Sequence, residues 1–72
     1  MTEHTEIFSL ESEYIALCDL LKCCGVAQTG GHAKLMISNG EVFVNQQVEQ
    51  RKTAKIRAGS VVSGEHFCIQ VQ

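Results

Sequence analysis

Apolar residues follow two different periods along the chain, and the change of period separates a helical part from a strand part. Residues 5–8 alternate and contain β-forming side chains, which predicts a short strand near the N-terminus. An amphipathic helix is expected next, with Ser12 placed to cap its start and Gly25 to end it. Its apolar stripe has the spacing i, i+3, i+4, i+7. The stripe consists of Tyr14, Leu17, Cys18 and Leu21.

A second helix is predicted to begin after Thr29, whose hydroxyl can accept a hydrogen bond from a free backbone amide. Leu35 falls toward its polar side, and Asn39 with Gly40 suits a left-handed turn at its end. Its buried stripe is expected to comprise Ala33, Met36 and Ile37.

Beyond the second helix the apolar period becomes two, the spacing of strands. Val42 and Val44 point one way, Val48 begins the return strand, and Ile56 is the apolar anchor of a polar segment. The expected turns lie at 45–47, 58–60 and 63–65, and the later strands at 61–62 and 66–71. The chain is therefore predicted to form a single α+β domain over residues 1–72. In it, two packed helices are followed by a small, mostly antiparallel sheet with N-terminal and C-terminal strands added.

Charge is divided between the two ends of the chain. The formal net charge is -2, yet residues 51–57 hold four of the six basic side chains and no acid. Between Lys22 and Arg57 six basic residues stand against two acidic ones, a local net of +4. Clustered positive charge in a small domain indicates a phosphate-binding face. A solvated loop that keeps the domain soluble is the alternative. The acidic residues before residue 20 are Glu3, Glu6, Glu11, Glu13 and Asp19.

Several functional classes find no support in the sequence. No apolar run approaches the roughly 20 residues that span a bilayer, and no signal peptide is recognisable, so we expect a cytoplasmic protein with no membrane partner. The four cysteines form no Cys-x-x-Cys pair, which favours reduced thiols over a metal site or disulfides. Neither a cofactor nor a metal is implied. Histidines 4, 32 and 66 are scattered and form no nucleophile–base pattern, so no catalytic residues are assigned.

The order of these features resembles the RNA-binding domain named after ribosomal protein S4, also called the αL motif. The resemblance covers residues 17–62. It rests on the first helix with Gly25, on the segments 29–37 and 39–45, and on Gly59 with the strand after it. It is nearest to the small stand-alone bacterial members, the YbcJ-type proteins. These share Gly30-Gly31 before Ala33-Lys34, Glu49 before Arg51-Lys52, and Lys55.

The resemblance implies a compact, non-catalytic module that docks on structured RNA. The expected partners are ribosomal or transfer RNA, and the ribosome or its assembly intermediates, with the protein acting as a monomer. This chain departs from the wider family at three positions. Gly30 stands where many members have arginine, Gln46 replaces a common glycine, and Ser60 replaces an acidic residue.

The candidate RNA-binding residues fall into two groups. If the helices pack antiparallel with the basic segment beside the second, one patch results, with Lys22 at its edge. Its centre comprises Lys34, Arg51, Lys52, Lys55 and Arg57. The second group surrounds the start of the second helix, where free amides attract anions. It comprises Thr29, Gly30, Gly31 and His32, and Asn45 is added from the following turn.

Aromatic side chains that could stack on bases are scarce. Tyr14 and Phe67 are assigned to the core, and His32 is expected to be partly buried and hydrogen-bonded. This favours recognition by shape and backbone. The alternative function is a protein-interaction module that uses the acidic N-terminal face, or Leu35 with Phe43.

Overall fold

A computed structural model of the protein describes residues 4–72, so Glu3 of the acidic N-terminal group lies outside the described residues. The domain is α+β, as predicted, and two strands are followed by two helices and then by the remaining strands. The elements are β1 (His4–Phe8), β2 (Ile15–Ala16), α1 (Leu17–Cys23), α2 (Gly30–Ser38), β3 (Phe43–Val44), β4 (Gln47–Val48), β5 (Lys55–Ile56), β6 (Val61–Ser63) and β7 (Phe67–Val71).

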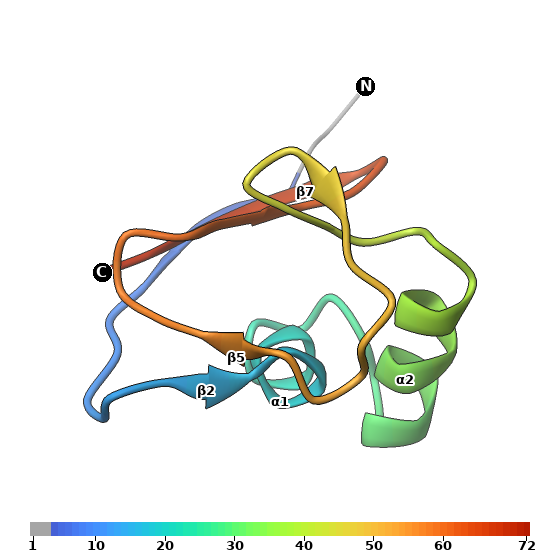
Figure 1. Cartoon of the computed structure of the whole chain (residues 1–72), viewed down its shortest axis with the longest axis horizontal. Coiled ribbons are helices and arrows are strands. Elements are labelled where there is room, and N and C mark those ends of the chain that lie inside the picture. The colour runs from blue at the N-terminus through green and yellow to red at the C-terminus, as the bar shows by residue number, and fades with distance from the viewer. Residues whose placement is uncertain (1–3) are drawn as a thin grey trace.

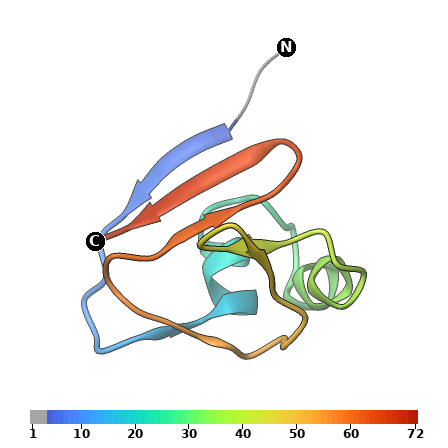
Figure 2. The same cartoon turned by 45° about the horizontal axis from the view of Figure 1, so that its top comes forward.

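The strands form two sheets, and Figure 1 shows the smaller one, β2 with β5, beside α1. The larger has the order β1-β7-β6-β3-β4, and all its pairs are antiparallel except β1 with β7. Figure 2 shows these two terminal strands side by side along one edge. The smaller sheet is the antiparallel pair β2 with β5. The prediction of a mostly antiparallel sheet extended by both terminal strands is therefore confirmed.

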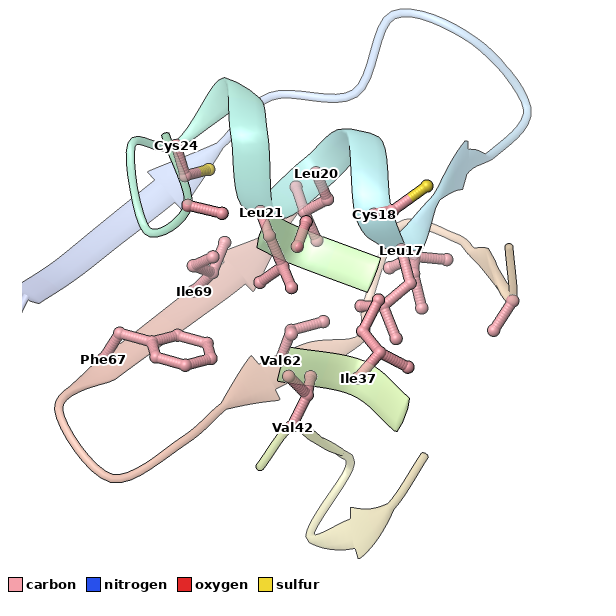
Figure 3. Packing of buried hydrophobic residues seen from close by; sticks show 14 of the residues in the cluster. Leu17, Cys18, Leu20, Leu21, Cys24, Ile37, Val42, Val62, Phe67 and Ile69 are labelled. Atoms are coloured by element: carbon pink, nitrogen blue, oxygen red, sulfur yellow. The ribbon is translucent and has the colours of Figure 1, made fainter. Parts of the chain in front are cut away.

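The core lies between the larger sheet and the two helices (Figure 3). Leu17, Leu20 and Leu21 of α1 are fully buried against side chains from α2 and from the sheet. Cys18 is buried among them, as the helical pattern predicted, and Cys24 just after the helix is buried too. The helices do not pack antiparallel: Figure 1 looks nearly down the axis of α1 but sees α2 from the side, so the two cross steeply.

The first helix starts later than the sequence pattern predicted. Ser12 does not cap it, since its hydroxyl donates to the Tyr14 carbonyl at 2.9 Å, and the residue before the helix, Ala16, caps with no side-chain bond. Residues 15–16 pair instead with 55–56 as β2 and β5. Tyr14 therefore precedes a strand and is 40% exposed, so its assignment to the core was wrong.

The ends of helices and strands follow local signals closely. Gly25 and Gly40 both have a φ of +77°, the left-handed conformation that ends each helix. Asn45 and Gln46 have φ values of +52° and +71°, which form a two-residue hairpin turn, so the return strand starts at Gln47 rather than at Val48. Gln46 thus occupies a conformation that favours glycine.

Candidate functional site

The basic segment 51–57 is fastened to the start of α1 by its own backbone. The Lys52 carbonyl accepts from the Cys18 amide at 3.1 Å, and the Ala54 carbonyl accepts from the Leu17 amide at 2.9 Å. The first amides of a helix lack partners within the helix, and here the basic segment supplies them. This satisfies the helix start that no side chain caps and holds the segment in one place.

The two residues just before the basic segment are attached near the end of α2. The Gln50 side-chain amide donates to the Ser38 carbonyl at 3.3 Å, and the Glu49 amide donates to the Val42 carbonyl at 3.0 Å. In Figures 1 and 2 the chain between β4 and β5 therefore runs past α2 before it pairs with β2. Lys34 is exposed on that helix.

Along residues 54–57 of the segment, buried and exposed side chains alternate. Ala54 and Ile56 are buried, Ile56 with only 2% exposure, whereas Lys52, Lys55 and Arg57 are exposed. Within residues 4–72 these three cations pair with no carboxylate. Their positive charge is therefore uncompensated, in contrast to that of Arg51.

Arg51 differs from its neighbours because Glu49 holds its guanidinium. Arg51 donates to the two carboxylate oxygens at 3.0 and 3.1 Å, and its own amide donates to one of them at 3.0 Å. These hydrogen bonds hold the pKa of Glu49 below its ordinary value. The Arg51 side chain remains 80% exposed, yet its charge is balanced locally.

Lys22 lies at the opposite end of α1 from the attachment of the basic segment. It stands in the last turn of the helix, and its carbonyl accepts from the Gly25 amide at 3.2 Å. At about 1.5 Å per residue, the helix axis separates it from Cys18 by roughly 6 Å. Its side chain is exposed, and its place at the edge of the RNA-binding patch stays a prediction.

The start of α2 is capped as the sequence predicted. The Thr29 hydroxyl accepts from the His32 amide at 3.0 Å, and the Thr29 carbonyl accepts from the Ala33 amide at 3.0 Å. A Cβ built on Gly30 would meet nothing within 4 Å, and one on Gly31 only the Thr29 hydroxyl at 3.9 Å. Internal packing therefore does not require either glycine, and the helix start stays open to a ligand.

The side chain of His32 faces a cavity. It lines this open cavity of about 760 Å³, together with the other two histidines, and the residues lining this cavity include no lysine or arginine. Its Nδ1 accepts a long hydrogen bond of 3.5 Å from the Gln28 amide. The expected hydrogen bond is thus present, but the prediction that His32 is partly buried was wrong, since the residue is exposed.

Asn45 is held by the sheet. Its Oδ1 accepts from the Val61 amide at 2.9 Å, while its own amide donates to the Val61 carbonyl at 2.7 Å. The side chain therefore fixes the hairpin turn to β6 through its acceptor oxygen.

Tyr14 is the residue at this face that the sequence analysis missed. The Lys55 Nζ lies 5.0 Å from the centroid of its ring, and the Arg57 Cζ lies 5.7 Å from it. Both distances are within the range of a cation–π contact. The sequence did not indicate this exposed position, because Tyr14 also fits the apolar helical stripe of Leu17 and Leu21.

The thiols within residues 4–72 lie apart from the histidine-lined cavity or are buried. Burial, followed by the nearby Glu6 carboxylate, raises the pKa of the Cys24 thiol to about 12. The exposed Cys23 does not line the cavity that the histidines share. Among residues 4–72 no three or more His, Cys, Asp or Glu side chains are grouped to hold a metal ion. No helix in that part of the chain has the length and apolar character to cross a bilayer.

Comparison with known sequences gives a consistent family. A family model described as "S4 domain" matches residues 8–72. The chain is 45% identical over 65 residues to the "Putative RNA-binding protein YbcJ" of Escherichia coli (strain K12), which covers 89% of this chain and 93% of that protein. It is 41% identical over 59 residues to the "Probable ribosome maturation protein RlbA" of Bacillus subtilis (strain 168). The matched region covers 82% of this chain and 83% of that protein.

Comparison with solved structures gives the same fold. The solution structure of YbcJ from E. coli matches with a TM-score of 0.71 at 44% identity, over 90% of this chain and 84% of that one. That structure is described as revealing an αL motif involved in RNA binding. The C-terminal domain of a tyrosyl-tRNA synthetase matches with a TM-score of 0.70 at 22% identity, over 93% and 78%, which shows a shared fold.

Proposed function

This chain belongs to the S4 domain family, and on that premise we propose that it is a non-catalytic module that docks on structured ribosomal or transfer RNA. The names of its relatives, one an RNA-binding protein and one a ribosome maturation protein, support a cytoplasmic role on the ribosome or its assembly intermediates. The protein acts as a monomer in this proposal.

The observation that carries the proposal is the set of cations on the basic segment that pair with no carboxylate within residues 4–72. Lys52, Lys55 and Arg57 are exposed on a backbone that is hydrogen-bonded to the start of α1. A chain with a net charge of -2 needs such a local face to attract a polyanion. Lys34 extends the face onto α2, and the open amides at Gly30 and Gly31 add a site for one phosphate.

The proposal is tested by measuring binding of the wild-type protein to structured ribosomal RNA fragments over a salt series. Affinity should fall steeply with salt, with a log–log slope of roughly 0.7 to 0.9 per phosphate contacted. An equally small acidic protein without a basic face serves as control. Binding no tighter than that of the control would refute the proposal.

Releasing Arg51 from its carboxylate should strengthen binding. In Glu49→Gln the guanidinium loses its charge partner, so the face gains one positive charge without losing any side-chain volume. We expect the affinity for the RNA fragment to rise severalfold and the salt slope to steepen by up to roughly 0.9. The matched control is Glu41→Gln, which removes a carboxylate from the side of the cavity. Equal gains in both variants would show only a general charge effect.

Replacing Gly30 and Gly31 by alanine should raise the stability of the protein but lower its affinity for RNA. Alanine has a higher helix propensity than glycine, and neither site is crowded, so the double variant should resist urea slightly better. A Cβ at these positions would nevertheless keep a phosphate from the helix amides, so RNA affinity should fall. Unchanged affinity in the more stable variant would remove this helix start from the RNA-binding face.

Exposed apolar side chains keep the protein-interaction alternative open. Leu35 is 58% exposed on α2, and Phe43 lies at the rim of the histidine-lined cavity. RNA binding that survives removal of the charges at Lys52 and Lys55 would favour this second function.

A further inference from the structure

The small sheet β2–β5 gathers an aromatic ring and two cations on one face. Ile15 pairs with Ile56 and Ala16 with Lys55, so continuing this antiparallel register sets Tyr14 opposite Arg57. Side chains alternate across a strand, and therefore Tyr14, Lys55 and Arg57 share the outer face. Ile56 fills the core on the inner face. The small side chain of Ala16 leaves room for the lysine stem to reach the ring.

This ring is unusual among the aromatic side chains of the chain. Phe67 is buried, Phe8 is partly buried, and Phe43 lies at the cavity that no lysine or arginine lines. Tyr14 alone is exposed beside cations that have no carboxylate partner within residues 4–72. Cation–π contacts of this kind stabilise an exposed site only weakly, so a ligand can displace them.

We infer that Tyr14 is a stacking platform for one unpaired base of the bound RNA, and that Lys55 and Arg57 bind the phosphates beside that base. The inference rests on the proposed function and specifies which part of the RNA that face recognises. Bases stack on aromatic rings and on guanidinium planes, and both surfaces are present here. When a base covers the ring, the flexible cations turn from it to the neighbouring phosphates.

The surroundings of the ring give the base an orientation. A shallow hollow borders Tyr14 and is lined by Ser12, Glu13 and Asp19 among others. Its carboxylates repel phosphate but accept hydrogen bonds from amino groups on a base edge. The sugar–phosphate backbone therefore lies toward Lys55 and Arg57, with the edge of the base toward the hollow.

The test compares two RNA hairpins that differ in one base. One carries a single bulged adenine, and the other has an abasic residue at the same position, so their phosphates are identical in number. The wild-type protein should bind the adenine hairpin roughly 5- to 150-fold more tightly, the range expected for one stacked base. Tyr14→Phe should retain most of this preference, and Tyr14→Leu should bind both hairpins equally. Because no charge changes, all salt slopes should agree.

Tyrosine emission gives an independent readout, because Tyr14 is the only tyrosine of a chain without tryptophan. The adenine hairpin should quench it more than the abasic hairpin does. Equal affinity of the wild type for both hairpins, or a preference that Tyr14→Leu retains, would overturn the inference while leaving RNA docking intact. If neither hairpin, nor any ribosomal fragment, binds above the acidic control, the proposed function itself fails.

Discussion

Replacing Lys52, Lys55 and Arg57 together by alanine is expected to weaken binding to structured ribosomal RNA by roughly 100-fold at about 0.1 M salt. Each of these exposed cations can displace counterions from one phosphate, and losing all three should flatten the log–log salt slope by roughly 2 to 3 units. The fold should survive because none of the three is buried or paired with a carboxylate within residues 4–72. Only the weak contacts of Lys55 and Arg57 with Tyr14 are lost.

Single variants provide the matched comparison for this prediction. Lys22→Ala removes the same charge as Lys52→Ala, but from the far end of α1. Although each variant removes one positive charge, Lys52→Ala should weaken RNA binding more than Lys22→Ala does. If the two variants lose affinity equally, the RNA is attracted by overall charge, and the basic segment has no special part in docking.

Alanine at Ile56 should have the largest effect on stability. This side chain is 2% exposed and is the apolar anchor between two exposed cations. A buried isoleucine replaced by alanine costs roughly 2 to 5 kcal/mol, because the cavity that it leaves collapses only in part. At roughly 0.05 to 0.15 kcal/mol per residue, a domain of this size has only about 4 to 11 kcal/mol of stability. Urea unfolding followed by circular dichroism should therefore show a large fraction of the folding free energy lost.

Two further variants calibrate that measurement. Ile56→Val removes one methylene and should cost roughly 0.5 to 1.5 kcal/mol, while Val48→Ala, at an exposed position, should change stability by less than about 0.5 kcal/mol. A loss for Ile56→Ala no greater than that for Val48→Ala would contradict the description of Ile56 as the anchor of the basic segment.

Elements with strong local signals were predictable from the sequence. Helix α2 begins directly after Thr29, whose hydroxyl caps it, and Gly40 lies in the left-handed turn just past its end; the sequence shows both signals directly. The last strand alternates cleanly, with Phe67, Ile69 and Val71 buried as expected. In these segments the local preference and the tertiary packing agree.

The start of α1 was not predictable in the same way. Tyr14 and Ile15 lie in a segment that fits a helix locally, but pairing with residues 55–56 draws it into a strand. That pairing joins positions far apart in the sequence, and no local sequence pattern predicts a strand pair that is two residues long. The exposed position of Tyr14, and with it the stacking platform, follows from this long-range contact.

The charge of the candidate site could be found from the sequence, but its detail could not. The cluster at 51–57 was evident, and the structure adds that the bonds to Leu17 and Cys18 hold it in place. Glu49 and Arg51 stand two residues apart, a spacing that puts their side chains on one side of an extended chain. That spacing could have indicated their ion pair. That His32 shares a cavity with His4 and His66 depends on tertiary packing alone.

The most direct test of the RNA-docking face is an NMR titration of the isotope-labelled protein with a structured ribosomal RNA fragment that it binds. The account predicts that the largest chemical-shift changes fall on the backbone amides of residues 51–57, on Gly30 and Gly31, and on Tyr14. Changes concentrated instead around Leu35, Phe43 and the histidine-lined cavity, with the basic segment unaffected, would contradict it.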